Sequence, residues 1–123
     1  MSTLNVSNIT DGTTTVGTSY VVNGSAKAWV HFNTSISTTI YSPSLNISSL
    51  TDHGSGNTTV TMINAFTGTS DYNTCGADDF YGMCNCGETS GRSASAFKVY
   101  NYNSSFGLVD CNNISVSMFG DLA

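Results

Sequence analysis

Short runs of alternating apolar and polar residues recur along the chain and leave little room for helices. The clearest run, "AKAWVHFN" at residues 26–33, puts Ala28, Val30 and Phe32 on one face of an extended strand and Trp29 and His31 on the other. Similar runs occur in "LNVSNI", "SLNISSL", "NTTVTMINAF", "SASAFKVYNYN" and "NISVSMF". Many short strands at close spacing predict an all-β fold of the sandwich or barrel type.

Two turn signals connect these strands. Asn23-Gly24 separates "SYVV" from "AKAWVHFN", and this dipeptide favours a two-residue hairpin turn because both residues tolerate positive φ. The glycine-rich stretch "TDHGSG" lies between "SLNISSL" and "NTTVTMINAF". We therefore predict one hairpin around Asn23-Gly24 and a second around residues 51–56.

The composition supports the same fold class. Charged residues make up 9 % of the chain, against about 25 % in ordinary globular domains. Lys and Glu, which favour helix surfaces, are nearly absent, while Ser, Thr, Asn and Gly supply about half of the sequence. The 123 residues are enough for one domain with a core of its own. We expect an antiparallel β-sandwich, jelly-roll-like, over residues 20–123, preceded by an extended attachment or oligomerisation segment over residues 1–19.

Charge and hydropathy exclude several classes of partner. The net charge is −5, and Lys27, Arg92 and Lys98 do not cluster, so the chain lacks a phosphate-tracking surface and we expect no nucleic-acid binding. No apolar run approaches the ~20 residues of a membrane-spanning helix. The first ten residues also lack the basic and apolar regions of a secretory signal peptide. We therefore expect synthesis in a cytoplasm and no membrane partner.

Residues 67–92 differ from the rest of the chain. They are loop-like and acidic, and they contain three of the four cysteines, Cys75, Cys84 and Cys86; the fourth is Cys111. Two disulfides that pin a long loop are the favoured reading, with Cys84 and Cys86, too close in sequence to pair easily with each other, taking Cys75 and Cys111 in either order. Free thiols and a zinc site are the alternatives, but the C-x-C spacing is not that of a zinc knuckle. We expect no metal and no cofactor.

The sequence offers little sign of enzymatic chemistry. Asp78 and Asp79 are adjacent, yet the region does not have the alternating oxygen ligands of a calcium loop. His31 and His53 have no evident catalytic partners, and no nucleophile elbow of the G-x-S-x-G type occurs. We predict no catalytic residues.

Several stretches resemble one family. "MSTLNVSNITDGTTTV", "YVVNGSAKAWVHFN", "SLNISSLTDHGSGNTTVTMINAF" and the terminal "GDLA" are similar to small fibre or structural proteins in the virions of tailed phages, marine phages and cyanophages among them. The resemblance covers roughly residues 1–66 and the last few residues, and it does not include the cysteine-rich region. It implies an oligomeric, non-enzymatic virion component made in the host cytoplasm.

The expected function is that of a small trimeric fibre module, of the tail or the head, with a capsid cement or decoration protein as the alternative. A carbohydrate-binding module for a host surface glycan is the alternative from another class, with Trp29 or the loop aromatics Tyr72, Phe80 and Tyr81 as its platform. The expected partners are further copies of the chain and other capsid or tail proteins. The oligomer-interface candidates are Leu4, Val6, Ile9 and Trp29. The candidates for partner or receptor contact are Asp78, Asp79, Phe80 and Tyr81.

Overall fold

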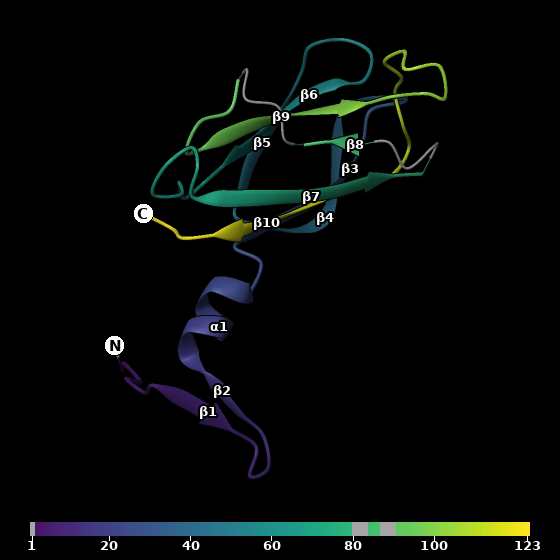
Figure 1. The fold of residues 1–123 in the computed structure, drawn as a ribbon. Helices are drawn as coiled ribbons and strands as arrows, with labels where there is room; N and C mark the ends of the chain where they lie inside the picture. The colour runs from purple at the N-terminus through teal and green to yellow at the C-terminus, as the bar shows by residue number, and fades with distance from the viewer. Residues whose placement is uncertain (1, 80–83, 87–90) are drawn as a thin grey trace.

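The computed structural model describes residues 2–79, 84–86 and 91–123. Its main body is a sandwich of two four-stranded antiparallel sheets (Figure 1). The strands of the first sheet, in spatial order, are β4 (Thr39–Leu45), β3 (Ala28–Asn33), β10 (Ile114–Gly120) and β7 (Tyr72–Asp78). Those of the second are β5 (Ile47–Asp52), β6 (Asn57–Met62), β9 (Ala96–Asn101) and β8 (Cys84–Asn85). The predicted all-β, antiparallel sandwich is confirmed.

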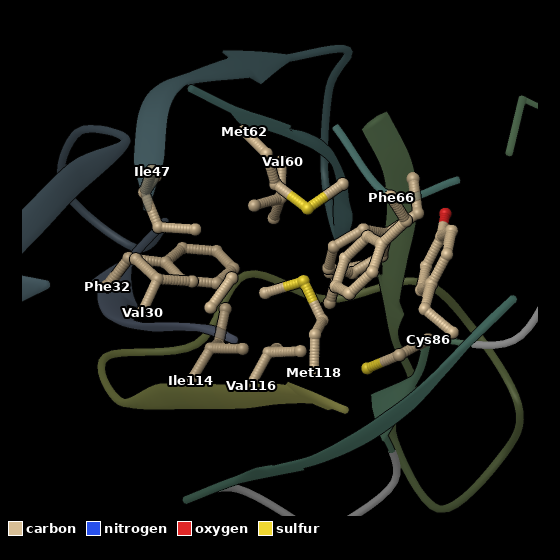
Figure 2. Close-up of a cluster of buried hydrophobic side chains, with 14 of the residues drawn as sticks. Val30, Phe32, Ile47, Val60, Met62, Phe66, Cys86, Ile114, Val116 and Met118 are labelled. Atoms are coloured by element: carbon tan, nitrogen blue, oxygen red, sulfur yellow. The ribbon is translucent and has the colours of Figure 1, made fainter. Parts of the chain in front are cut away.

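The core lies between the sheets and follows the alternation read from the sequence. Figure 2 shows Val60 and Met62 of β6 facing Val116 and Met118 of β10 across the interior. The inward side chains of β3, β9 and the start of β10 are Ala28, Val30, Phe32, Phe97, Val99 and Ile114, and all are buried. Burying one large apolar side chain contributes about 1.5–3 kcal/mol. These strands therefore supply most of the drive for the two sheets to pack.

An N-terminal arm, defined here as residues 2–24, projects from one end of the sandwich (Figure 1). It begins with a hairpin of β1 (Asn8–Thr10) and β2 (Thr15–Gly17) and continues into the helix α1 (Thr18–Gly24). Asp11 closes the hairpin turn, since its carboxylate accepts hydrogen bonds from the N–H groups of Thr13 and Thr14 at 3.0 and 2.8 Å. These bonds, from Thr14 first, lower the pKa of Asp11. The expected boundary after residue 19 falls inside α1.

The predicted hairpin at Asn23-Gly24 is wrong, because these residues end α1 and are followed by a short link to β3. The Ser25 N–H bonds back to the Val21 carbonyl, and the Lys27 side chain reaches the carbonyl of Val22 at the helix C-terminus. A cation there interacts favourably with the unpaired carbonyls of the last turn. The Lys27 N–H meanwhile bonds to the Met118 carbonyl at 2.8 Å, so this residue joins the arm to the sandwich.

The second predicted hairpin is confirmed as β5–β6, with a register running from Ile47↔Met62 to Asp52↔Thr58. Its tight connection depends on Gly56, which has φ +62°. A Cβ at this position would lie 2.6 Å from the Val109 N and 2.7 Å from the Asn101 O, both of them backbone atoms. Only glycine allows the neighbouring segments to approach so closely.

Residues 67–92, expected to be a loop, contain two strands. β7 pairs with β10 over seven positions, from Tyr72↔Gly120 to Asp78↔Ile114. The inward positions of β7 include a threonine and Gly76 as well as Tyr72, so the strand has no run of large apolar residues to reveal it. Tyr72 is also buried, stacked on Phe66 with ring centroids 4.5 Å apart, which rules it out as a platform for a glycan.

Candidate interaction surfaces

The arm carries a concentration of exposed apolar side chains. Leu4 is 82 % exposed, and Val6 and Ile9 are exposed as well, so the three interface candidates of this segment lie open to solvent. The structure adds four exposed residues that the sequence reading did not select: Val16, Tyr20, Val21 and Val22. The last three lie at residues 20–22, where the sequence pattern predicts a strand of the sandwich and not an exposed helix.

Charge on the arm is minimal. Asp11 is the only charged residue between residues 2 and 24. The consecutive positions Tyr20, Val21 and Val22 cover several sides of α1, so the helix does not confine its apolar surface to a single stripe facing the sandwich. A weakly charged segment with apolar side chains on several sides is suited to burial against other chains.

Trp29 occupies a different surface, the outer face of the β4-β3-β10-β7 sheet. It is half-buried and lies opposite Leu45 of β4 and Ser117 of β10 in the strand register. Leu45 and Phe119 are exposed on this sheet. The fourth interface candidate is therefore partly accessible, and it belongs to the sandwich and not to the arm.

His31 lies two residues further along the same face and is held by its neighbours. Its ring centroid is 4.7 Å from that of Tyr41, and its Nε2 lies 3.2 Å from the Asn113 Oδ1. Asn113 in turn donates its backbone N–H and side-chain amide to the Asp79 carboxylate at 3.1 and 2.8 Å. These bonds, the side-chain bond first, lower the pKa of Asp79. His31 is thus a partnered surface residue.

The predicted partner-contact residues separate. Asp79 is exposed on the outer side, whereas Asp78 is half-buried and accepts a hydrogen bond from the Asn101 Nδ2 of β9 at 3.0 Å. The two adjacent carboxylates therefore point to opposite sides of the sheet, that of Asp78 toward β9 and that of Asp79 toward solvent. Phe80 and Tyr81 lie outside the described residues. Of this group, Asp79 has the placement that a contact with another molecule needs.

The four cysteines are free thiols and occupy three environments. Cys75 is exposed on β7, and its neighbour Gly76 faces Cys84 and Cys86. Because successive residues of a strand point to opposite faces, Cys75 is directed away from those two sulfurs, and this geometry does not fit the predicted disulfide from Cys75 to either. Cys111 is buried, and its surroundings raise the pKa of its thiol to about 11, mainly through desolvation.

Cys84 and Cys86, expected not to pair, are brought together with their sulfurs 3.1 Å apart. The hydrogen bond between them raises the pKa of Cys84 and lowers that of Cys86. In residues 2–79, 84–86 and 91–123, no three His, Cys, Asp or Glu side chains form a group that could hold a metal ion. The helix within those ranges is too short to cross a membrane.

Comparison with known proteins gives no relative from which a function could be transferred. No family model matches the chain, and no curated protein or solved structure is significantly similar to it.

Proposed function

We propose that the chain is a non-enzymatic structural module of a virion surface, in which the N-terminal arm assembles copies of the chain and the sandwich is displayed as the head. The observation that carries this proposal is the arm itself. Its apolar side chains are exposed in the single chain, although a buried position would be more favourable for each of them.

Further copies of the same chain are the partners that fit the arm best. The arms of two copies would meet with one carboxylate each, so their mutual repulsion is small although the whole chain carries a net charge of −5. Closed symmetry lets a self-complementary segment cover its apolar surface in every copy at once. We favour three copies, as in a fibre module of the tail or head, and the resemblance to phage fibre proteins points the same way. A capsid decoration protein would use the same arm at another place on the particle.

Removal of residues 2–24 tests the proposal. Light scattering and native mass spectrometry of the full chain should give a trimer at micromolar concentration, and the truncated chain should be a monomer. The truncation removes none of the buried core side chains, so its circular dichroism should retain the β-sheet signal. A full-length monomer, or a truncated chain that still forms trimers, would contradict the role of the arm.

A second candidate function is glycan binding through the outer face of the first sheet. The observation in its favour is that Trp29 is partly accessible beside exposed Leu45. Aromatic rings with one accessible face suit the apolar side of a sugar. Trp29→Ala with unchanged oligomeric state and lost binding on a glycan array would favour this function. Trp29→Ala that weakens the oligomer would instead place Trp29 in the subunit contact.

A further inference from the structure

Cys84 and Cys86 form a close pair of thiols between the edges of the two sheets. β8 ends the second sheet, and Cys84 of this strand lies opposite Asn101 in its pairing with β9. Residues two apart in an extended segment point to the same face. Cys84 and Cys86 accordingly direct their sulfurs to one side, where the sulfurs lie 3.1 Å apart.

Gly76 of the other sheet provides the space for both sulfurs. A Cβ at this position would lie 2.6 Å from the Cys86 Sγ, closer than real Cβ atoms approach other atoms, and 3.0 Å from the Cys84 Sγ, which is also unusually tight. The position of Cys86 is fixed further by the Thr74 hydroxyl, which donates to the Cys86 carbonyl at 2.6 Å. Cys86 is 5 % exposed and faces the core (Figure 2), whereas Cys84 is half-buried. The chain thus holds two thiols at a distance at which atoms can react.

The hydrogen bond between the sulfurs prepares them for different roles. The contact between the sulfurs lowers the pKa of Cys86 and raises that of Cys84. A thiolate is the nucleophile in thiol–disulfide exchange, and a neighbouring thiol can then displace the first leaving group. Cys86 fits the attacking role and Cys84 the resolving role.

We propose that Cys84 and Cys86 are a thiol–disulfide exchange site that accepts a low-molecular-weight disulfide, such as oxidised glutathione, as its oxidant. The Cys86 thiolate attacks one sulfur of the oxidant, forms a mixed disulfide and releases one thiolate. Cys84 then loses its proton to solvent and attacks the Cys86 sulfur, which closes the intramolecular disulfide and releases the second thiolate. Two cysteines lose two electrons, and the oxidant is reduced to two thiols.

Local opening of β8 can give the oxidant access to the buried Cys86. β8 is a two-residue strand at the end of its sheet, so it is a segment where local opening costs little compared with global unfolding. Cys75 and Cys111 provide the controls, because Cys75 faces the opposite side of β7 and Cys111 lies in the segment before β10 with its N–H bonded to the Thr34 hydroxyl at 3.0 Å. Neither is needed for the proposed exchange.

The test uses the full chain with the double substitution Cys75→Ser and Cys111→Ser, so that only the pair remains. The protein is equilibrated with mixtures of reduced and oxidised glutathione, quenched with an alkylating reagent in denaturant and weighed intact. We expect a species that has lost two hydrogen atoms and takes up no alkyl group, and we expect reduced glutathione to convert it back. Two alkylated cysteines at every glutathione ratio would overturn the proposal.

A third substitution, Cys84→Ser, in the same background separates the two roles. Without the resolving thiol, Cys86 should accumulate as the mixed disulfide with one glutathione, a species that should be minor when Cys84 is present. Peptide mapping of the wild-type protein should link Cys84 to Cys86. A link from either to Cys111, or a metal ion that the reduced wild-type protein retains in its native mass until a chelator is added, would overturn the proposal.

Discussion

Leu4→Ser tests most directly whether the arm is buried in an assembly. Leu4 is 82 % exposed in the single chain, so its present contribution to the stability of the monomer is small. Fully burying a leucine side chain contributes about 1.5–3 kcal/mol. If the assembly covers the exposed part, the residue contributes about 1–2.5 kcal/mol per subunit to association.

A trimer contains three copies of this contact, which together amount to about 3–7.5 kcal/mol. Each 1.4 kcal/mol is a factor of ten in an equilibrium constant. Leu4→Ser should therefore lower the monomer–trimer association constant by roughly two to five orders of magnitude. The free energy of unfolding of the monomer should change little, because a solvated surface residue is being replaced.

Sedimentation equilibrium over a dilution series measures the constant for wild-type and variant protein. Ile36→Ser is the matched control, because Ile36 is 89 % exposed but follows β3 on the sandwich and lies outside the arm. The control should leave the association constant unchanged. The same constant for wild type and Leu4→Ser, or equal weakening by both substitutions, would refute the reasoning.

Three further results are expected. Gly56→Ala should lower the free energy of unfolding, measured by urea titration, by about 2–5 kcal/mol through backbone strain and overpacking. Gly54→Ala, with open space around the glycine, should cost only the backbone strain of about 1–2 kcal/mol. Equal costs for the two substitutions would contradict the close approach of Val109 and Asn101 to Gly56. Phe32→Ala should cost about 3–5 kcal/mol by leaving a cavity between the sheets, measurable by the same titration; a cost below this range would mean that the core collapses around the site. Because the pKa of Asp79 is lowered in the folded state, its ionised carboxylate stabilises the fold at pH values above the ordinary pKa of 3.8. This stabilisation is lost as the pH falls through the lower pKa that Asp79 has in the folded state. Asn113→Ala should therefore raise the Asp79 pKa measured by NMR, and an unchanged pKa would exclude Asn113 as the cause.

The strands that the sequence predicted well are those that carry apolar residues at most of their inward positions. β10 presents Ile114, Val116 and Met118 to the core, and the intervening serines lie on the other face. β7 could not be recognised in this way, because Gly76 and other small or polar residues occupy its inward positions. The space there is filled by sulfur atoms from the opposite sheet, a contact between distant segments that local alternation does not encode.

At α1 the local sequence pattern failed in the opposite way, because it predicted a strand where the chain forms a helix. Val21 and Val22 favour strands, and Asn23-Gly24 favours a hairpin turn, so local preference predicted a ribbon. The outcome depends on partners remote in sequence, since β3 pairs with β4 and β10 and leaves no position for the residues before it. Tertiary pairing thus overrides a strong local signal.

The candidate sites were predictable to a similar degree. Leu4, Val6 and Ile9 were selected from their sequence pattern, and they are exposed as an interface requires. The pairing of Cys84 with Cys86 was missed, although the C-x-C spacing in an extended segment is itself the signal that both side chains share a face. The missing information was the glycine opposite them, which becomes apparent only when both sheets are assembled.

The double attachment of Lys27 has a mechanical consequence. Its side chain holds the end of α1 and its backbone N–H bonds to β10, so tension applied to the arm enters the sandwich next to the first residue of β3. β3 is an interior strand with hydrogen-bonded neighbours on both sides. Antiparallel ladder bonds run perpendicular to the strands. A pull along β3 therefore shears two ladders at once and distributes the force over many bonds, whereas a pull on a strand at the edge of a sheet would peel it away one bond at a time.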